Sequence, residues 1–285
     1  MIAFVFPGQG SQSPGMGKDL YDSNAAAKEI FQTADKTLGF SLTELIFTGT
    51  EADLQKTSNA QPAILTVSIA MLRAKNKLPD ITAGHSLGEY SALVCADALD
   101  FAEAVGLVRF RGECMERAAV KGGMAAVLGL AAEVIENTLA KYTGVEIANY
   151  NCPDQTVISG ETAALQKVCD DLTAAGAKRV VPLAVSGPFH SSMMISAADE
   201  YRQRLDKAAI RDPKIPLIAN VTADYAKDAA SIRELLYRQV FSSVRWTQSV
   251  VKMLAEGVNT IEEIGPGRVL TGLVKKIQGE NNKNG

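Results

Sequence analysis

The chain has 285 residues, of which 47% are hydrophobic and 21% are charged, and its formal net charge is −3. These values are typical of one large α/β domain or of a domain with an insert. The small negative net charge excludes a positive surface over the whole protein that would bind nucleic acid. No apolar run approaches the roughly 18 residues that a membrane helix needs. Residues 1–6 are apolar but have no basic flank or cleavage site, so they predict a buried strand and not a signal peptide, and we expect a cytoplasmic protein.

Short apolar runs alternate with helical patterns in the first part of the chain. Residues 1–6 predict one strand, and Ile81–Ala83 predicts another after the break at Pro79-Asp80. The helical patterns lie at Asn24–Leu38, Pro62–Asn76, Glu89–Ala96 and Phe101–Ala119. This alternation is typical of a mostly parallel sheet covered by helices.

The segment 122–188 has a different order of elements. Strands are expected at Met124–Leu130, Val145–Tyr150, Gln155–Ser159 and Arg179–Val185, and helices at Ala132–Lys141 and Thr162–Ala175. The resulting order β-α-β-β-α-β is that of a ferredoxin-like fold. We therefore predict a small ferredoxin-like α+β domain, 122–188, inserted into a larger hydrolase-like α/β domain made of residues 1–121 and 189–285.

The last part of the chain returns to the α/β pattern. Helices are expected at Ile195–Ala209, Ile232–Gln239, Gln248–Glu256 and Leu270–Gln278, and strands at Ile215–Asn220 and Thr260–Ile264. The polar end, Gly279–Gly285, is expected to be disordered. No heptad pattern or apolar surface stripe is visible, so we expect a monomer.

The only two histidines of the chain both lie in motifs that suit catalysis. Gly84-His85-Ser86-Leu87-Gly88 matches Gly-x-Ser-x-Gly, the nucleophile elbow that exposes a serine between a strand and a helix. Adjacent residues on such a turn point apart, so His85 is a poor base for Ser86 and His190 becomes the candidate. The alternative is a glycine-rich turn with an unreactive serine.

Several further motifs follow one another along the chain and carry a resemblance to a known family. They are Phe6-Pro7-Gly8-Gln9-Gly10-Ser11-Gln12, Gln61-Pro62-Ala63, the elbow with its continuation to Leu93, Arg111-Gly112, Asn149-Tyr150-Asn151, Gly187-Pro188-Phe189-His190-Ser191 and Gly265-Pro266-Gly267-Arg268-Val269-Leu270. Together they resemble the malonyl-CoA:acyl-carrier-protein transacylases, from the first strand to about Lys276. The resemblance implies transfer of a malonyl group from malonyl-CoA to the phosphopantetheine thiol of an acyl carrier protein, without a cofactor.

The same resemblance implies roles for the residues that match the motifs. Ser86 would be the nucleophile and His190 its base. The backbone N–H groups of Gln9 and Leu87 would bind the oxyanion of the tetrahedral intermediate. A backbone carbonyl near Arg245 would orient the base, although related chains often carry Gln at this position.

Substrate-binding roles are implied for a second set of residues. Arg111 would bind the free malonyl carboxylate, because a guanidinium can hold a carboxylate bidentately. The alternative is a solvated basic face, since Arg109 and Arg117 lie on the same predicted helix. Gln61 would lie near the acyl pocket, or simply begin a helix. Phe189 would lie against the α-carbon of the acyl group and exclude an α-methyl.

Other residues leave their interpretation open. Asn149 and Asn151 are expected to line the channel for CoA or pantetheine, or to form a turn beside Pro153. His85 is expected to pack behind the elbow. The loop Pro7–Gly10 lacks the spacing and the lysine of a nucleotide-binding loop.

Four cysteines, Cys95, Cys114, Cys152 and Cys169, form no C-x-x-C pair and no cluster with zinc spacing, so we expect reduced thiols and no metal.

Three other functions remain open: a trans-acting polyketide synthase acyltransferase, a serine thioesterase, and an inactive module that docks a carrier protein.

Overall fold

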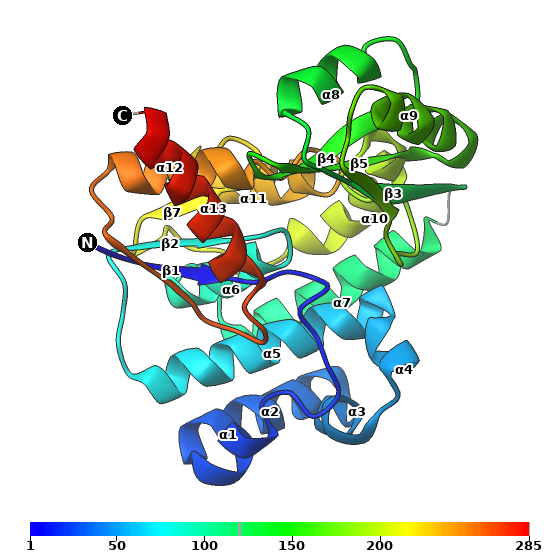
Figure 1. Ribbon diagram of the computed structural model, residues 1–285. Helices are drawn as coiled ribbons and strands as arrows, with labels where there is room; N and C mark the ends of the chain where they lie inside the picture. The colour runs from blue at the N-terminus through cyan, green and yellow to red at the C-terminus, as the bar shows by residue number, and fades with distance from the viewer. Residues whose placement is uncertain (119–120, 285) are drawn as a thin grey trace.

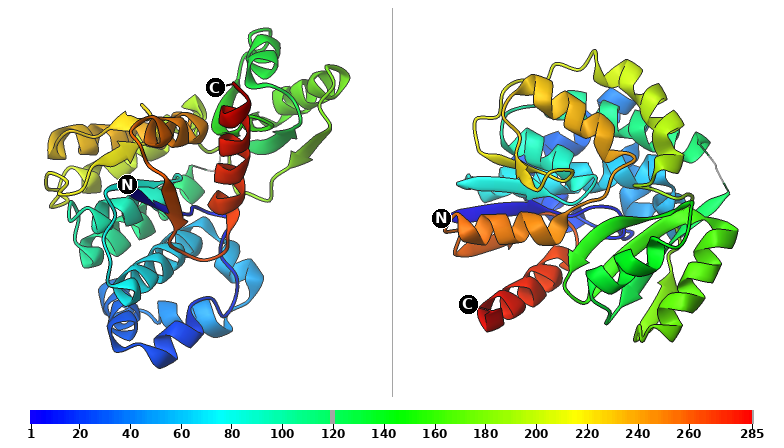
Figure 2. Two further views of the ribbon diagram at one scale, coloured as in Figure 1. Left: turned by 60° about the vertical axis from the view of Figure 1, so that its left-hand side comes forward. Right: turned by 90° about the horizontal axis from the view of Figure 1, so that it is seen from above.

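The computed structural model describes residues 1–118 and 121–284 and has a mixed α/β architecture (Figures 1 and 2). Its larger sheet has the strand order β8-β7-β2-β1-β9, in which only the pair β7–β8 is antiparallel. These strands are β1 (Ile2–Phe6), β2 (Ile81–Gly84), β7 (Leu217–Ala219), β8 (Asp224–Tyr225) and β9 (Thr260–Glu263).

Both faces of this sheet are buried, as expected for parallel strands covered by helices. Along β1, Phe4 and Phe6 join one hydrophobic cluster, whereas Ala3 and Val5 join a second cluster on the opposite face. The first cluster is built mainly from α2 (Ala25–Leu38), α5 (Thr57–Lys75), α6 (Gly88–Cys95), α7 (Phe101–Arg117), α10 (Ile195–Leu205) and α11 (Ala229–Gln239). The second is built from α12 (Trp246–Ala255) and α13 (Val269–Asn284).

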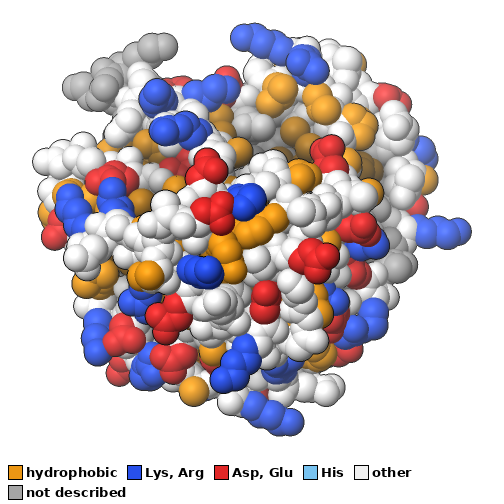
Figure 3. Space-filling model, turned by 90° about the horizontal axis from the view of Figure 1, so that it is seen from below, with side chains coloured by type: hydrophobic (Ala, Val, Ile, Leu, Met, Phe, Trp, Pro, Cys, Tyr) orange, Lys and Arg blue, Asp and Glu red, His pale blue; other side chains and the backbone are white. Residues whose placement is uncertain are grey.

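Four further short helical segments lie outside the second sheet and its helices. They are α1 (Lys18–Ser23), α3 (Leu42–Thr48), α4 (Glu51–Gln55) and the 3₁₀ turn η1 (Ser192–Met194). In Figure 1 the first three lie together at the end of the molecule opposite the antiparallel sheet. The face drawn in Figure 3 carries basic and acidic side chains side by side, in keeping with the small net charge.

The second sheet is antiparallel and lies within residues 122–182. Its strand order is β4-β5-β3-β6, with the helices α8 (Ala132–Leu139) and α9 (Thr162–Ala174) packed on one face. The strands are β3 (Gly122–Leu128), β4 (Val145–Cys152), β5 (Gln155–Glu161) and β6 (Arg179–Pro182). The opposite face, with Met124, Ala126 and Val157, packs into the first cluster of the large sheet.

Two backbone hydrogen bonds connect the antiparallel sheet to the larger part of the molecule. The N–H of Val244 donates to the carbonyl of Ala148 at 2.8 Å, and the N–H of Tyr150 donates to the carbonyl of Val244 at 2.9 Å. Strand β4 is therefore held directly against the segment that precedes α12. Two residues of β4, Asn149 and Asn151, consequently reach the edge of the cavities described below.

Several element boundaries differ from those predicted. Helix α5 begins at Thr57 and includes Pro62, because the carbonyl of Ser58, which loses its helical donor at the proline, accepts a hydrogen bond from Arg109 at 3.1 Å. Helix α13 extends to Asn284, where disorder was expected. The helix predicted at Phe101–Ala119 ends at Arg117, and Ala119 lies outside the described residues. Within the described residues, no helix is long and apolar enough to cross a membrane.

Candidate active site

Ser86 lies on the tight turn between β2 and α6, as the elbow motif predicts. Its φ of 51° is in the left-handed region, which is strained for a residue with a side chain. The turn requires glycine at its flanks, since a Cβ on Gly88 would lie 2.0 Å from the carbonyl oxygen of Phe6. The N–H of His85 donates to the same oxygen at 3.0 Å, so the elbow is fixed to the end of β1.

His190 is brought to Ser86 from a loop more than a hundred residues away. The Ser86 Oγ and His190 Nε2 atoms lie 2.8 Å apart, and the other ring nitrogen, Nδ1, lies 2.8 Å from the carbonyl oxygen of Gln239. A carbonyl can only accept, so Nδ1 carries the proton and Nε2 presents its lone pair to the serine. This is the geometry of a general base beside a nucleophile.

The prediction that Arg245 supplies the orienting carbonyl is wrong. Arg245 directly precedes α12, and its carbonyl oxygen accepts from the N–H and the Oγ of Ser249, at 2.9 and 2.8 Å. The orienting oxygen belongs to Gln239, the last residue of α11, because the final carbonyls of a helix have no intrahelical donor and remain free for other partners. The guanidinium of Arg245 lies over the ring of Tyr150, 5.8 Å from its centroid.

Burial and charge keep His190 neutral. Removal from water is the main reason that its pKa falls to about 3, and the positive charge of Arg111 lowers it further, while the hydrogen bond to Gln239 acts in the opposite direction. The imidazole is therefore unprotonated throughout the neutral pH range and available to accept the serine proton.

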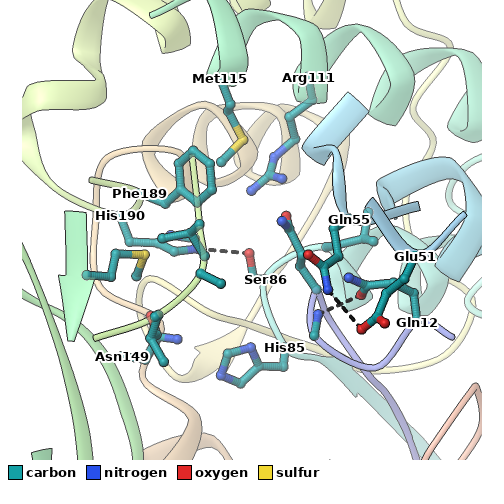
Figure 4. Close-up of a pocket in the computed structure, with 17 residues that line it drawn as sticks. Gln12, Glu51, Gln55, His85, Ser86, Arg111, Met115, Asn149, Phe189 and His190 are labelled. Atoms are coloured by element: carbon teal, nitrogen blue, oxygen red, sulfur yellow. Dashed lines mark hydrogen bonds between the residues drawn. The ribbon is translucent and has the colours of Figure 1, made fainter. Parts of the chain in front are cut away.

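A cavity of about 400 Å³ opens in front of Ser86. Figure 4 shows Arg111, Met115, Phe189 and His190 around one side of it, and Gln12, Glu51 and Gln55 around the other. A second cavity of about 260 Å³ shares Gln9, His85, Asn149 and Leu183 with the first, so the two adjoin one another.

Arg111 is the cation of this cavity. It is only 1% exposed, so the alternative of a solvated basic face does not describe it; Arg109 and Arg117 on the same helix are more exposed and pair with Glu113. Its two terminal nitrogens donate to the side-chain oxygens of Gln61, at 2.8 Å, and Gln239, at 3.0 Å. Each terminal nitrogen keeps a second N–H, so the guanidinium retains the capacity to bind a carboxylate.

Two backbone donors near Ser86 are available to an anion. Among the hydrogen bonds of the described residues, none is donated by the N–H of Gln9 or of Leu87, although both residues line the cavity. The side chain of Gln9 is instead held by the hydroxyl of Thr57 at 3.2 Å. Because a backbone N–H beside a cavity is seldom left without a partner, these two groups are suited to an oxyanion.

The remaining predicted residues differ in their position relative to the cavities. Phe189 is 5% exposed and lines the cavity, next to His190. Gln61 does not line it but holds Arg111 from behind. Asn151 lines only the second cavity, where its side-chain oxygen lies 2.8 Å from Nε2 of His85. His85 itself lines both cavities, although it was expected to pack behind the elbow.

Three polar residues that sequence analysis missed hold this arrangement together. Asn220 accepts from the N–H of Ser86 at 2.7 Å, and the side-chain nitrogen of Gln239 donates to the carbonyl of Ser86 and to Glu89. Asn220 could have been found, because it directly follows β7 at the carboxyl edge of the parallel strands, where functional residues gather. Glu89 and Gln239 carry no comparable signal.

No group of three or more His, Cys, Asp or Glu side chains in the described part of the chain could hold a metal ion. The cysteines are free thiols; Cys95, Cys114 and Cys152 are buried. The pair Ser86–His190 beside this cavity is the arrangement that nucleophilic acyl transfer requires.

Comparison with known proteins places this arrangement in a family. The acyl transferase domain model matches residues 3–283. The chain is 51% identical to the malonyl CoA-acyl carrier protein transacylase of Bacillus subtilis (strain 168), over 97% of this chain and 90% of the relative, and 45% identical to that of Staphylococcus aureus (strain MRSA252), over 96% and 92%.

Solved structures agree. The crystal structure of an acyl carrier protein S-malonyltransferase from Vibrio cholerae has a TM-score of 0.94 and 43% identity, over 97% of this chain and 93% of that one. A malonyl-transacylase solved in complex with a type II PKS acyl-carrier protein has a TM-score of 0.94 and 42% identity, over 98% and 93%. The chain therefore belongs to the acyl transferase domain family, among the malonyl CoA-acyl carrier protein transacylases.

Proposed function

We propose that this protein transfers a malonyl group from malonyl-CoA to the phosphopantetheine thiol of an acyl carrier protein, through an acyl-enzyme on Ser86. One observation carries the proposal: the hydrogen-bonded pair Ser86–His190 shares its cavity with the buried cation Arg111. A nucleophile with its base suits any acyl thioester, but a buried guanidinium in the same cavity suits an acyl group that ends in a carboxylate.

In the first half-reaction, the Ser86 Oγ attacks the thioester carbonyl while Nε2 of His190 takes the hydroxyl proton. The carbonyl oxygen becomes an oxyanion, which the N–H groups of Gln9 and Leu87 would bind. The intermediate then collapses: the carbon–sulfur bond breaks, and His190 returns the proton to the departing CoA thiolate. The products are malonyl-Ser86 and free CoA.

The second half-reaction is the reverse with another thiol. His190 takes the proton of the phosphopantetheine thiol, whose sulfur attacks the ester carbonyl of malonyl-Ser86. Collapse of the second intermediate breaks the carbon–oxygen bond, and the proton returns to the Ser86 oxygen. Protons, thiols and the acyl group balance over the cycle without an oxidant, reductant or metal, so we propose that the enzyme needs no cofactor.

Two side chains are proposed to select the acyl group. Arg111 would bind the malonyl carboxylate with the N–H groups that Gln61 and Gln239 leave free. Phe189, which lies beside the base, would fill the space that an α-methyl group needs. The channel for pantetheine would run past Asn149, which lines both adjoining cavities, with Asn151 beside it.

We also propose the domain organisation that the sequence predicts: a hydrolase-like domain of residues 1–121 and 189–285, and a ferredoxin-like domain of residues 122–188. The order β4-β5-β3-β6 and the separate cluster formed by α8, α9 and their sheet support this division. A reducing, cytoplasmic setting is supported by the four unpaired cysteines.

The proposed function is tested by incubating the enzyme with malonyl-CoA and a phosphopantetheinylated carrier protein, and by following the carrier's intact mass. We expect one malonyl group on the carrier with the wild-type enzyme and none with Ser86→Ala. Free malonate formed at the same rate without a carrier would instead identify a thioesterase, and no reaction with any carrier would identify a docking module. Carriers from fatty-acid and polyketide systems, tested in parallel, separate the conventional enzyme from a trans-acting polyketide synthase acyltransferase.

A further inference from the structure

A buried carboxylate that the mechanism does not use lies behind the active site. Glu89 is the second residue of α6, three residues after the nucleophile, and it is only 2% exposed. Burial raises the pKa of this carboxyl to about 7. The hydrogen bonds that the carboxyl accepts lower its pKa, but their effect is smaller. A carboxylate is costly to bury, so its place beside the elbow calls for a partner that needs it.

Glu89 has two such partners, and both bear on the catalytic residues. Its Oε2 atom accepts from the side-chain nitrogen of Gln239 at 2.7 Å and from the backbone N–H of Asn220 at 3.1 Å. Asn220 in turn accepts from the N–H of Ser86 at 2.7 Å and donates to the carbonyl of Gly84 at 2.6 Å. The carboxylate thus fixes both sides of the elbow at once.

Gln239 connects this carboxylate to the cation of the cavity. Its side-chain oxygen accepts from Arg111 at 3.0 Å, its side-chain nitrogen donates to Glu89 and to the carbonyl of Ser86, and its backbone carbonyl accepts from His190. Arginine has no acceptor, and the Oε2 atom of Glu89 accepts from the amide nitrogen, so the amide satisfies both neighbours in one orientation only. Glu89 therefore keeps the amide oxygen turned toward Arg111.

We propose that Glu89 is a positioning residue for malonyl recognition: through the side-chain amide of Gln239 it holds Arg111 in the orientation that binds a carboxylate and ties that arginine to the pair Ser86–His190. This inference rests on the proposed function, because it concerns the same substrate. It differs from a purely structural role in what it predicts. Loss of Glu89 should reduce malonyl transfer more than acetyl transfer, because only malonyl uses Arg111.

The main test compares kcat and KM for malonyl-CoA and acetyl-CoA in three single variants. Glu89→Met keeps the length of the side chain but removes both acceptors, and we expect kcat/KM for malonyl-CoA to fall by roughly 10- to 100-fold, with a rise in KM and a smaller loss for acetyl-CoA. Glu89→Gln keeps an oxygen that can accept both bonds, so the malonyl-to-acetyl ratio should return to within roughly threefold of wild type. Gln239→Met leaves the carbonyl for His190 and should lower the ratio like Glu89→Met.

Ser91→Ala is the matched control. Ser91 lies on the same helix, is fully buried, and its hydroxyl has no partner among the described residues, so its loss should leave the malonyl-to-acetyl ratio unchanged. The double variant Glu89→Met/Gln239→Met tests the route: if Glu89 acts through Gln239, the second substitution should add little to the first.

The outcomes separate the inference from the function on which it rests. A wild-type ratio in Glu89→Met, a ratio in Glu89→Gln as low as in Glu89→Met, or fully additive losses in the double variant would each overturn the inference. If Glu89→Met does not fold, an unchanged ratio in Gln239→Met has the same consequence. Absence of malonyl transfer in the wild-type enzyme would instead overturn the proposed function.

Discussion

Arg111 is buried between two glutamine oxygens, so its charge is directed at whatever enters the cavity beside Ser86. We expect Arg111→Ala to lower kcat/KM for malonyl-CoA by about 10- to 100-fold, since a charged hydrogen bond contributes about 1.5–3 kcal/mol. Acetyl transfer should change little. The control is Arg117→Ala on the same helix, whose half-exposed side chain pairs with Glu113 and Glu200 and should leave the malonyl-to-acetyl ratio unchanged. Equal losses for both substrates in Arg111→Ala would show that this arginine does not read the carboxylate.

Phe189 lines the cavity next to the base. A rigid ring at this position should exclude an α-methyl, and a mismatch of one methyl group corresponds to a preference of about 10- to 200-fold for malonyl-CoA over methylmalonyl-CoA. Phe189→Ser should narrow this preference and lower the overall rate. A competition assay with the two thioesters measures both effects, and equal use of them by the wild-type enzyme contradicts the steric account.

At the scale of single residues, the sequence predicts side chains better than backbone groups. The proximity of Ser86 and His190 could be predicted, because the motif of the serine is local and because only two histidines exist, one of which adjoins the serine. The orienting carbonyl was assigned to Arg245 and belongs to Gln239, since every residue carries a carbonyl and only the tertiary arrangement of α11 selects one. Glu89 and Gln239 were missed for a related reason: they are hydrogen-bonded to each other, but they lie 150 positions apart in the chain.

At the scale of elements, the turn between β2 and α6 depends on how closely two backbones approach. In Gly88→Ala, the new Cβ would lie 2.0 Å from the carbonyl oxygen of Phe6, so α6 must move away from β1 and displace Ser86. We expect a stability loss of about 1–3 kcal/mol, measured by urea unfolding, together with loss of acyl-enzyme formation.

The control for this prediction is Gly272→Ala in α13. No atom lies within 4 Å of a Cβ at Gly272, and this glycine is inside a helix, so alanine should stabilise the protein by about 0.5–1 kcal/mol. If Gly88→Ala is as stable and as readily acylated as wild type, the close approach of α6 and β1 does not hold the nucleophile.

The long amphipathic elements were predicted, whereas their ends and the short helices were not. Pro62 is typical of a first helical turn, and so the sequence placed the start of α5 there. The helix begins at Thr57 because Arg109, from α7, satisfies the carbonyl that the proline leaves free. Such compensation comes from another element and is invisible to a local pattern. The helices α1, α3 and α4 are too short for a clear periodicity.

At the scale of the whole molecule, the two buried histidines link stability to pH. The pKa values of both His85 and His190 are lowered in the fold, mainly by burial, and that of His190 falls to about 3. The unfolded chain therefore binds more protons below the ordinary histidine pKa of about 6.5, so this contribution to stability is complete above that pH and is lost progressively below it.

For His190 the loss between pH 7 and pH 5 should be about 2 kcal/mol. Urea unfolding at pH 7, 6 and 5 measures this loss as the difference between the wild type and His190→Gln. The comparison is needed because Glu89, whose pKa burial raises to about 7, has the opposite effect: its protonation in the fold stabilises both proteins as the pH falls over the same range. The decline of the wild type and of His190→Gln should differ only below about pH 6.5. Parallel declines would mean that His190 is not buried as a neutral group.

The overall order of elements was predictable because hydrophobic periodicity and strand length are local, and the chain alternates them regularly. The relative placement of the two sheets was not. It depends on the backbone ladder between Val244 and the residues Ala148 and Tyr150, whose sequences show no sign of pairing. This contact brings Asn149 to the cavity. Because the contact is not visible in the sequence, the sequence could not decide whether this segment lines a substrate channel or only forms a turn.

The acyl-serine intermediate is the central claim, and mass spectrometry of the enzyme incubated with malonyl-CoA alone tests it most directly. The account predicts an intact-mass increase of a single malonyl group, located on the peptide that contains Ser86, and its absence in Ser86→Ala. A malonyl group found on one of the four cysteines, with Ser86 unmodified, would contradict the account.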